Sequence, residues 1–196
     1  MASSFPFIAG DPSLDLVNTE VHHSQPGGSD DLFNDPAAAV QWFLQVGLLN
    51  VSEAELIDPE SVRQSSLRLR TALDALYRPL ARRTPDLKAL ERSLVTLNAV
   101  LDQGRERVQL QVKAGKVERT SRFEGIGPFD PTVRVAHSAA ELLDRLEGHR
   151  LKECQNPECD LLFYDESRNA SRRWCSMAGC GNQQKQARFR SSKNHS

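Results

Sequence analysis

The stretch that decides the fold is CQNPECDLLFYDESRNASRRWCSMAGC, residues 154–180. Its cysteines form two C-x4-C pairs, Cys154 with Cys159 and Cys175 with Cys180, separated by 15 residues. Each pair can place two sulfur atoms about 3.8 Å apart around a tetrahedral ion with a metal–sulfur distance of about 2.3 Å. Four thiolates favour zinc over harder ions, and a shell filled by protein ligands leaves no open position for a catalytic water. The spacing therefore predicts one structural zinc ion held by these four cysteines.

The residues within and between the two pairs agree with this interpretation. Pro157 and Gly179 lie inside the pairs, where the chain needs a tight turn. Between the pairs, Leu161–Tyr164 can form a strand and Ser167–Ala170 a turn. A hairpin in this position would bring the two cysteine pairs together.

Other uses of four cysteines remain open at this point. They could form two disulfides, remain ordinary buried thiols, or hold an iron–sulfur cluster. The cysteines are confined to 27 consecutive residues, and the chain begins without a basic region followed by an apolar one. Both observations favour a reduced compartment and metal binding, and we expect a cytoplasmic protein without a membrane span.

Charge is distributed unevenly along the 196 residues, of which 39% are hydrophobic and 26% charged. Residues 1–153 hold 18 Lys/Arg and 22 Asp/Glu, a net charge of −4, whereas residues 168–196 hold seven Lys/Arg and no acid, a net charge of +7. This composition predicts a globular chain with a core of its own and a basic C-terminal segment.

Helical periodicity dominates the N-terminal part of the chain. Asp35-Pro36 resembles a helix start, and the apolar residues that follow share one face until about Gly47. A longer helical pattern runs from about residue 60 to 83, where Pro79 is expected to kink or shorten the helix.

The next segment has the most regular helical pattern. Thr84 is expected to cap the helix, with Pro85 and Asp86 in its first turn, and Gly104 to end it. Its leucines recur at spacings of three and four, which predicts that the whole stripe lies in the core: Leu87, Leu90, Leu94, Leu97 and Leu101.

After Gly104 the period changes from that of a helix to that of a strand. Val108, Leu110 and Val112 alternate with polar residues, and Ala114-Gly115 offers a turn, so the sequence predicts a β-hairpin that returns over residues 117–123. A second helix start at Asp130-Pro131 begins a pattern that ends near residue 148. We therefore expect a mainly α fold with a β-hairpin, in which a helical N-terminal domain precedes a small C-terminal treble-clef or ribbon-like zinc finger.

The cysteine-rich segment resembles the CGNR zinc finger. The resemblance lies in both cysteine pairs and in the polar and aromatic residues around them: Phe163-Tyr164-Asp165, Ser167-Arg168-Asn169, Arg172-Arg173-Trp174-Cys175-Ser176, Cys180-Gly181-Asn182 and Lys185. Residues Leu14–Thr19 and the Trp42-Phe43-Leu44 helix resemble the ABATE domain, which usually precedes this finger. The resemblance implies an ABATE-like domain over residues 1–148 and a finger over 149–196. It also implies DNA binding, since members of the family are described as stress-induced transcriptional regulators, and ligand sensing or dimerisation by the N-terminal domain.

One position departs from the family motif. Gln183 stands where the motif has its arginine, so a cation that could reach a phosphate or a base is missing. Glutamine can still read adenine through two hydrogen bonds in the major groove. The departure leaves the metal ligands untouched and changes one expected DNA contact.

Basic and amide side chains near the finger predict a nucleic-acid interface. The segment after Cys180 is expected to be helical, and basic groups there would bind phosphates in a salt-dependent manner, while amides could touch base edges. The candidate DNA contacts are Arg172, Arg173, Asn182, Gln183, Lys185, Arg188 and Arg190.

Three alternatives weigh against DNA binding. The basic groups could offset the charge of about −2 that four thiolates give a zinc site. The finger could instead dock a protein, or its thiolates could act as a redox switch.

No pattern pairs a nucleophile with a base or forms a nucleotide-binding loop, so we expect no enzymatic activity. A small-molecule effector and a homodimer are further expectations; Asn18 and Thr19 either line a ligand pocket or cap a helix end.

Overall fold

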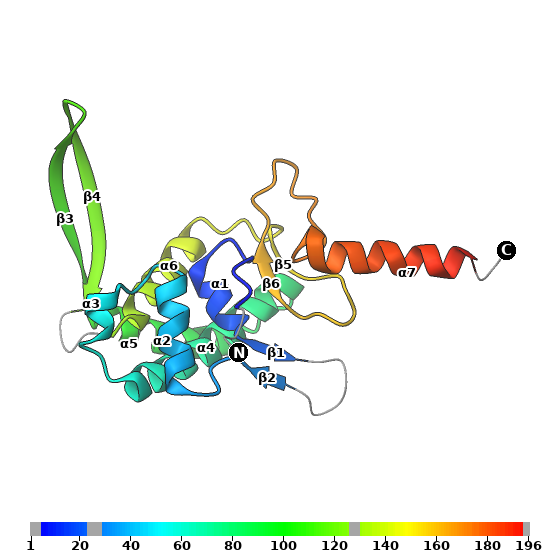
Figure 1. Ribbon diagram of the computed structural model, residues 1–196, viewed down its shortest axis with the longest axis horizontal. Coiled ribbons are helices and arrows are strands. Elements are labelled where there is room, and N and C mark those ends of the chain that lie inside the picture. The colour runs from blue at the N-terminus through cyan, green and yellow to red at the C-terminus, as the bar shows by residue number, and fades with distance from the viewer. Residues whose placement is uncertain (1–4, 23–28, 126–129, 194–196) are drawn as a thin grey trace.

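The computed structural model describes residues 5–22, 29–125 and 130–193. Over these ranges the protein is mainly helical, with three separate two-stranded antiparallel sheets (Figure 1). None of the described helices combines the length and the apolar character that a membrane span requires.

The helices of the described residues are α1 (Pro12–Val17), α2 (Pro36–Gln45), α3 (Val51–Ala54), α4 (Pro59–Arg82), α5 (Leu87–Leu101), α6 (Thr132–Asp144), the short π-helix η1 (Met177–Gly181) and α7 (Asn182–Lys193). The strands are β1 (Glu20–His22) with β2 (Ser29–Asp31), β3 (Gly104–Lys113) with β4 (Lys116–Gly125), and β5 (Leu151–Glu153) with β6 (Leu162–Tyr164).

Aspartate followed by proline starts several helices, because the carboxylate accepts a hydrogen bond from a free N–H while proline occupies a position that needs no donor. Asp35 accepts from Ala38 N at 2.8 Å, as predicted for α2. The prediction for α5 was wrong by two residues: Asp86 is the cap, and it accepts from Lys88 N, whereas Thr84 lies outside the helix. At α6 the Asp130 carboxylate accepts from Thr132 N at 2.9 Å, one residue before the assigned cap.

The core lies between α1, α2, α4 and α6. Trp42 and Phe43 of α2 are fully buried and meet edge to face, with ring centroids 4.9 Å apart. From α4, Leu69, Leu73 and Tyr77 pack into the same core. Aromatic and leucine side chains of this size supply most of the apolar area that a domain of this length buries.

Two expectations about the central helices need correction. The leucine stripe of α5 is not all core: Leu97 is buried, but Leu87 is 73% exposed and Leu94 is 37% exposed. Periodicity identifies residues that share a face, but α5 covers α4 with only part of that face. Of the two expected effects of Pro79, the shortening is wrong: α4 continues to Arg82 and terminates where Arg83 adopts a left-handed conformation with φ of 59°.

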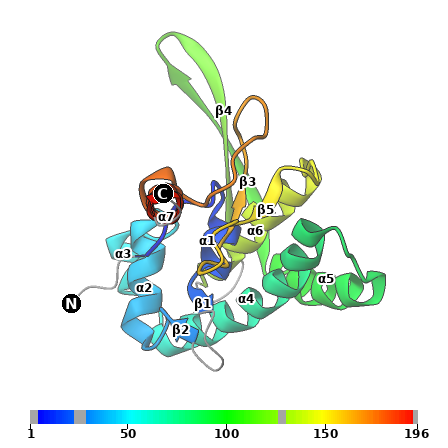
Figure 2. The ribbon, with the colours of Figure 1, turned by 90° about the vertical axis from the view of Figure 1, so that its right-hand side faces the viewer.

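The β3–β4 hairpin forms as predicted and projects from the body (Figures 1 and 2). Its two-residue turn has positive φ at both Ala114 (49°) and Gly115 (76°), as the twist of a hairpin requires. At its base, Gly104 is needed for close approach, since a Cβ there would overlap Phe123 and Val133. Phe123 also stacks on His137 of α6, so the base of the hairpin is anchored and its outer part is not.

The cysteine-rich segment packs onto the helical part instead of standing apart from it. β6 pairs with β5, and this hairpin contacts α4 and α1, so apolar residues on both sides of position 148 belong to one core. Arg78 of α4 donates to the Asp160 carbonyl at 2.9 Å and forms an ion pair with its carboxylate. The expected hairpin between the cysteine pairs is therefore wrong, because Leu162–Tyr164 pairs with Leu151–Glu153 on its N-terminal side. The division at residue 148 stays a prediction.

Candidate zinc centre

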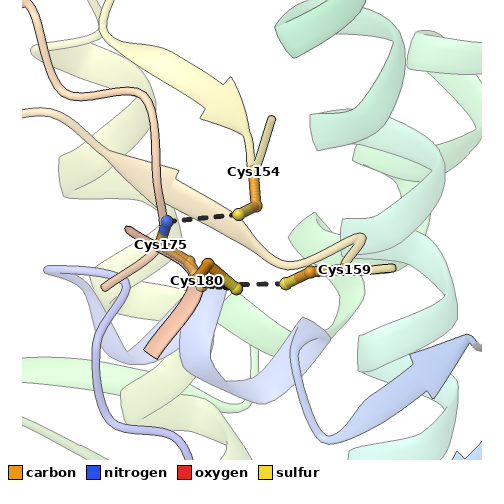
Figure 3. A group of neighbouring side chains, drawn as sticks. All are labelled: Cys154, Cys159, Cys175 and Cys180. Atoms are coloured by element: carbon orange, nitrogen blue, oxygen red, sulfur yellow. Dashed lines mark hydrogen bonds between the residues drawn. The ribbon is translucent and has the colours of Figure 1, made fainter. Parts of the chain in front are cut away.

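The four cysteine side chains converge on one point (Figure 3). All four sulfur atoms lie within 4.8 Å of one another; Cys159 and Cys175 Sγ are 3.7 Å apart, and Cys175 and Cys180 Sγ are 3.6 Å apart. These two separations are close to the sulfur–sulfur spacing of about 3.8 Å around a tetrahedral zinc ion. The geometry brings together the two pairs that the sequence predicted.

Cys154 and Cys159 flank a tight turn at the end of the β5–β6 hairpin. Cys154 N donates to the Leu161 carbonyl at 2.9 Å, which continues the strand pairing to the first ligand. Cys159 N donates to the Asn156 carbonyl at 2.9 Å and closes the turn that contains Pro157. The backbone therefore fixes the separation of the first two sulfur atoms.

Cys175 and Cys180 lie at the start of the C-terminal helical segment. The Ser176 hydroxyl accepts from Gly179 N at 3.3 Å, and the Ser176 carbonyl accepts from Gly181 N at 2.9 Å. This cap winds η1 so that Cys180 turns back toward Cys175. Two ligands thus come from a hairpin turn and two from the start of a helix; the treble-clef assignment stays a prediction.

Hydrogen bonds to sulfur and burial act on the thiols in opposite directions. Cys175 N donates to Cys154 Sγ at 3.4 Å, yet burial raises the pKa of Cys154 to about 11. The hydrogen bond from Cys175 lowers the pKa of Cys159 to about 6, and the same contact raises the pKa of Cys175. Four thiols so close together cannot all ionise without a cation between them, so metal binding must release protons.

The donor set and the burial fit one structural zinc ion. Cys154, Cys175 and Cys180 are buried and Cys159 is half-buried. Four thiolates complete a tetrahedral shell for zinc and leave no position for a water nucleophile. The cluster is therefore suited to holding the segment together.

Asn156 connects the zinc centre to α7. Its side chain is buried, and its Nδ2 donates to Cys180 Sγ at 3.3 Å and to Gln183 Oε1 at 3.1 Å. Its Oδ1 accepts from Gln184 Nε2 at 2.9 Å. Beside this network a cavity of about 440 Å³ separates the cysteine turn from α7, with Glu158 and Arg190 among its lining residues. The carboxamide of Asn156 therefore fixes both a zinc ligand and the first turn of α7.

Asp165 organises the loop between the two pairs. Its buried carboxylate accepts from Lys152 Nζ at 2.7 Å, from Ser167 Oγ at 2.6 Å and from Arg172 N at 2.8 Å. Burial alone would raise the pKa of this carboxyl, but the hydrogen bonds outweigh it and hold the pKa well below its usual range. The expected turn at residues 167–170 is confirmed, with Ala170 N donating to the Ser167 carbonyl at 3.1 Å.

Arg172, a predicted DNA contact, has its guanidinium turned into the protein. It donates to the backbone carbonyls of Ile8 and Trp174 at 3.0 Å each and to that of Cys175, and it lies 4.4 Å over the Phe163 ring. These contacts give it a structural role that ties the N-terminal segment to the finger. It is not part of the DNA surface that we propose below.

The other predicted DNA contacts lie outside the core. Arg173 is exposed and donates to Gln155 Oε1 at 2.6 Å. Asn182, Gln183, Lys185 and Arg190 are exposed residues of α7. Arg188 belongs to the same helix, but its side chain lies outside the described residues.

Sequence reasoning missed several residues whose side-chain hydrogen bonds join segments of the fold. Asn18 caps α1, one of its two predicted roles, and it is fully buried against Leu162 instead of lining a pocket. In the sequence, Asn156 and Asp165 stand out only through their places in a cysteine pair and in a family motif. An asparagine inside a cysteine pair, where a thiolate needs donors, was the available signal for Asn156.

Comparison with protein families gave two matches that follow one another along the chain. Residues 10–145 match the ABATE family, described as "Putative stress-induced transcription regulator", and residues 150–193 match the CGNR zinc finger. A comparison with curated proteins gave no match. Because the first match spans more than half of the chain and the second contains the four-cysteine cluster, the chain belongs to the ABATE family and carries a CGNR zinc finger with one structural zinc site.

Proposed function

We propose that this protein is a DNA-binding transcriptional regulator and that α7 is the helix that contacts DNA. The observation that carries the proposal is the position of α7. It begins at the zinc centre, packs on η1 in its first turns, and then runs away from the body for the rest of its 12 residues (Figure 1). A free α-helix fits the width of the major groove, about 12 Å.

The chemistry of α7 favours nucleic acid over a protein partner. Among its described side chains, residues 182–187 and 190, Ala187 is the one apolar residue and none is acidic. A helix that docks in a protein groove needs an apolar face, which these side chains do not provide. Neither Lys185 nor Arg190 forms an ion pair among the described residues, so both cations are available to phosphates.

The exposed residues can be assigned separate roles. Arg173, Lys185 and Arg190 would bind phosphates and position the helix. Asn182 and Gln186 lie one turn apart on α7 and would face base edges, whereas Gln183 and Gln184 are held by Asn156. Zinc would hold the start of α7 in a fixed orientation and take no part in chemistry.

The N-terminal domain would supply the regulation. A cavity of about 520 Å³ lies beside α6, lined by Arg134, His137, Phe123 and Leu48 among others, and it would accept a small effector. We propose that the protein acts in the cytoplasm during stress, with reduced thiols and without catalytic activity of its own. These roles draw on the family description and on the four thiols.

The experiment is duplex binding by the zinc-loaded protein at two salt concentrations. The variant Lys185→Gln/Arg190→Gln is compared with Lys88→Gln/Arg92→Gln, which removes two exposed charges from α5. We expect the α7 variant to bind more weakly and to depend less on salt. The magnitude of the negative slope of log K against log salt should decrease by about 2, because each lost phosphate contact decreases it by about 1. The α5 variant should bind as the unchanged protein does.

Two results would overturn the proposal. Equal losses in both variants would mean that only net charge matters, and absence of binding at low salt would mean that α7 does not contact DNA. Zinc release by oxidant levels that spare ordinary thiols would instead favour a redox switch.

A further inference from the structure

The β3–β4 hairpin exposes apolar side chains along one face of its outer part. Leu110 is 72% exposed, Val112 is 76% and Val117 is 71%, and Val108 is also exposed. Residues two apart on a strand share a face, and Val112 lies directly opposite Val117, so these four residues form one apolar surface. In the single chain, this surface faces solvent on a ribbon that projects from the body (Figure 2).

A two-stranded hairpin is marginal by itself in water, and each of its edges presents unpaired N–H and C=O groups. Here no third strand pairs with β3 or β4 among the described residues. We infer that this hairpin is a dimerisation arm: β4 pairs antiparallel with β4 of a second copy around a two-fold axis at Thr120. The inference concerns self-association and holds whether or not α7 binds DNA.

The residues of β4 are self-complementary in this register. With the axis at Thr120, Lys116 lies opposite Glu124 of the second copy, and Val117 lies opposite Phe123. Each pair occurs twice because of the two-fold symmetry. Opposite charges and apolar pairs directly across neighbouring strands stabilise a sheet.

Neighbouring registers of β4 lack this complementarity. An axis at residue 119 or 118 places Arg119 or Glu118 against its own copy, and an axis at 121 places Glu118 against Glu124. Like charges directly opposite each other destabilise a sheet. Among the registers with the axis at residues 118–121, the charge pattern therefore favours Thr120.

The other edge of the hairpin, β3, cannot pair with itself in this way. Its basic residues Arg105, Arg107 and Lys113 occupy one face of the strand, and its one acid, Glu106, occupies the other. Residues directly opposite in an antiparallel pair share a face, so no two-fold register places Glu106 against a basic residue of the second β3. Because β4 can form opposite-charge pairs with its own copy and β3 cannot, we assign the interface to β4.

The dimer would extend the two-stranded hairpin and cover one of its two edges. It would form a four-stranded sheet in the order β3–β4–β4–β3, which buries the two β4 edges. Val117 of each copy would lie beside the half-buried Phe123 of the other, which gives an apolar contact at each end of the pairing.

The test is sedimentation velocity of the full-length, zinc-loaded chain over a concentration series. We expect a monomer–dimer equilibrium that Lys116→Glu weakens about tenfold or more, since two attractive pairs become repulsive. The double variant Lys116→Glu/Glu124→Lys should restore it. Lys113→Glu is the matched control, because it reverses the same charge beside the same turn but on β3, and it should leave dimerisation unchanged.

Three outcomes would overturn the inference. They are a monomer at every concentration, a dimer that Lys116→Glu and Val117→Asp both leave intact, and a double variant that dimerises no better than the two single ones. Zinc content and near-UV circular dichroism report whether each variant is folded, and all these positions lie on the projecting hairpin.

Discussion

The carboxamide of Asn18 forms two hydrogen bonds with the backbone of Leu162, 144 residues away along the chain. Asn18 Nδ2 donates to the Leu162 carbonyl at 2.9 Å, and Leu162 N donates to Asn18 Oδ1 at 2.9 Å. The side chain therefore completes the outer edge of β6 as a third strand would. The helical domain and the zinc finger share this contact within one core.

We expect Asn18→Ala to lower the free energy of unfolding by about 2–4 kcal/mol, because it leaves a buried N–H and C=O without partners. Urea unfolding of the zinc-loaded protein measures the change. Hydrogen exchange should show faster opening of residues 162–164. Asn98→Ala, which removes an exposed asparagine from α5, is the control. Equal unfolding free energies of the two variants would mean that the hydrogen bonds between Asn18 and Leu162 do not stabilise the fold.

The contacts that the sequence predicted are local ones. Asp35-Pro36 starts α2, Ala114-Gly115 turns the hairpin, and two C-x4-C pairs place their sulfur atoms together, each because neighbouring residues fix the backbone. Asn18 could not be placed, since its partner lies 144 residues away and its chemistry suits a cap or a pocket equally well. Sequence distance therefore explains why the partner of Asn18 could not be predicted.

Charge and periodicity left the roles of some residues ambiguous for a second reason. Each describes a property of the residue itself and does not identify the groups that surround it in the fold. Arg172 has the charge of a phosphate contact, but backbone carbonyls of the protein surround its guanidinium. Leu87 has the spacing of a core residue, but none of the described elements covers it at the start of α5. Such residues need the tertiary structure before a role can be assigned.

Asp15 should make stability depend on pH. Burial raises the pKa of its carboxyl to about 6, although Ile8 N and Ala9 N donate to it. Because the folded pKa lies above the unfolded value, the folded state holds the proton more tightly, and stability falls as pH rises from about 4 to about 6. Titration of Asp15 should account for about 3 kcal/mol of this fall in unfolding free energy, and Asp15→Asn should remove that part of it.

The measurement is the difference in unfolding free energy between Asp15→Asn and the unchanged protein across this pH range. A difference between two proteins cancels the titration of groups that both retain, including Asp165. Glu91→Gln, an exposed carboxylate on α5, is the control and should show a constant difference. If Asp15→Asn also gives a constant difference, the carboxyl of Asp15 does not titrate in this range.

Asn156 should set zinc affinity without being a ligand. Its Nδ2–H donates to Cys180 Sγ and so stabilises the thiolate. We expect Asn156→Ala to weaken zinc binding by about 10–100-fold, the usual effect of losing a partner of a metal ligand. Competition with a chelator measures it. Affinity should also fall as pH is lowered, because protons compete for the four thiolates.

Gln155→Ala is the matched control for Asn156→Ala, since it removes the neighbouring exposed amide, which contacts Arg173 and no sulfur. It should retain the zinc affinity of the unchanged protein. Equal affinities in both variants would show that the hydrogen bond to Cys180 contributes nothing. A metal content other than one zinc per chain would contradict the site itself.

Gln183→Arg tests the position at which this chain departs from the family motif. Gln183 Oε1 accepts from Asn156 Nδ2, and an arginine cannot accept a hydrogen bond, so its guanidinium would leave the network and extend from α7. If α7 binds DNA, the variant should bind duplex more tightly and steepen the slope of log K against log salt by about 1. Gln183→Ala separates the two effects, because it removes the acceptor without adding a cation. Tighter binding in both variants would mean that release from Asn156, and not the added charge, is responsible; tighter binding in Gln183→Arg alone would identify this position as a phosphate contact that glutamine has weakened.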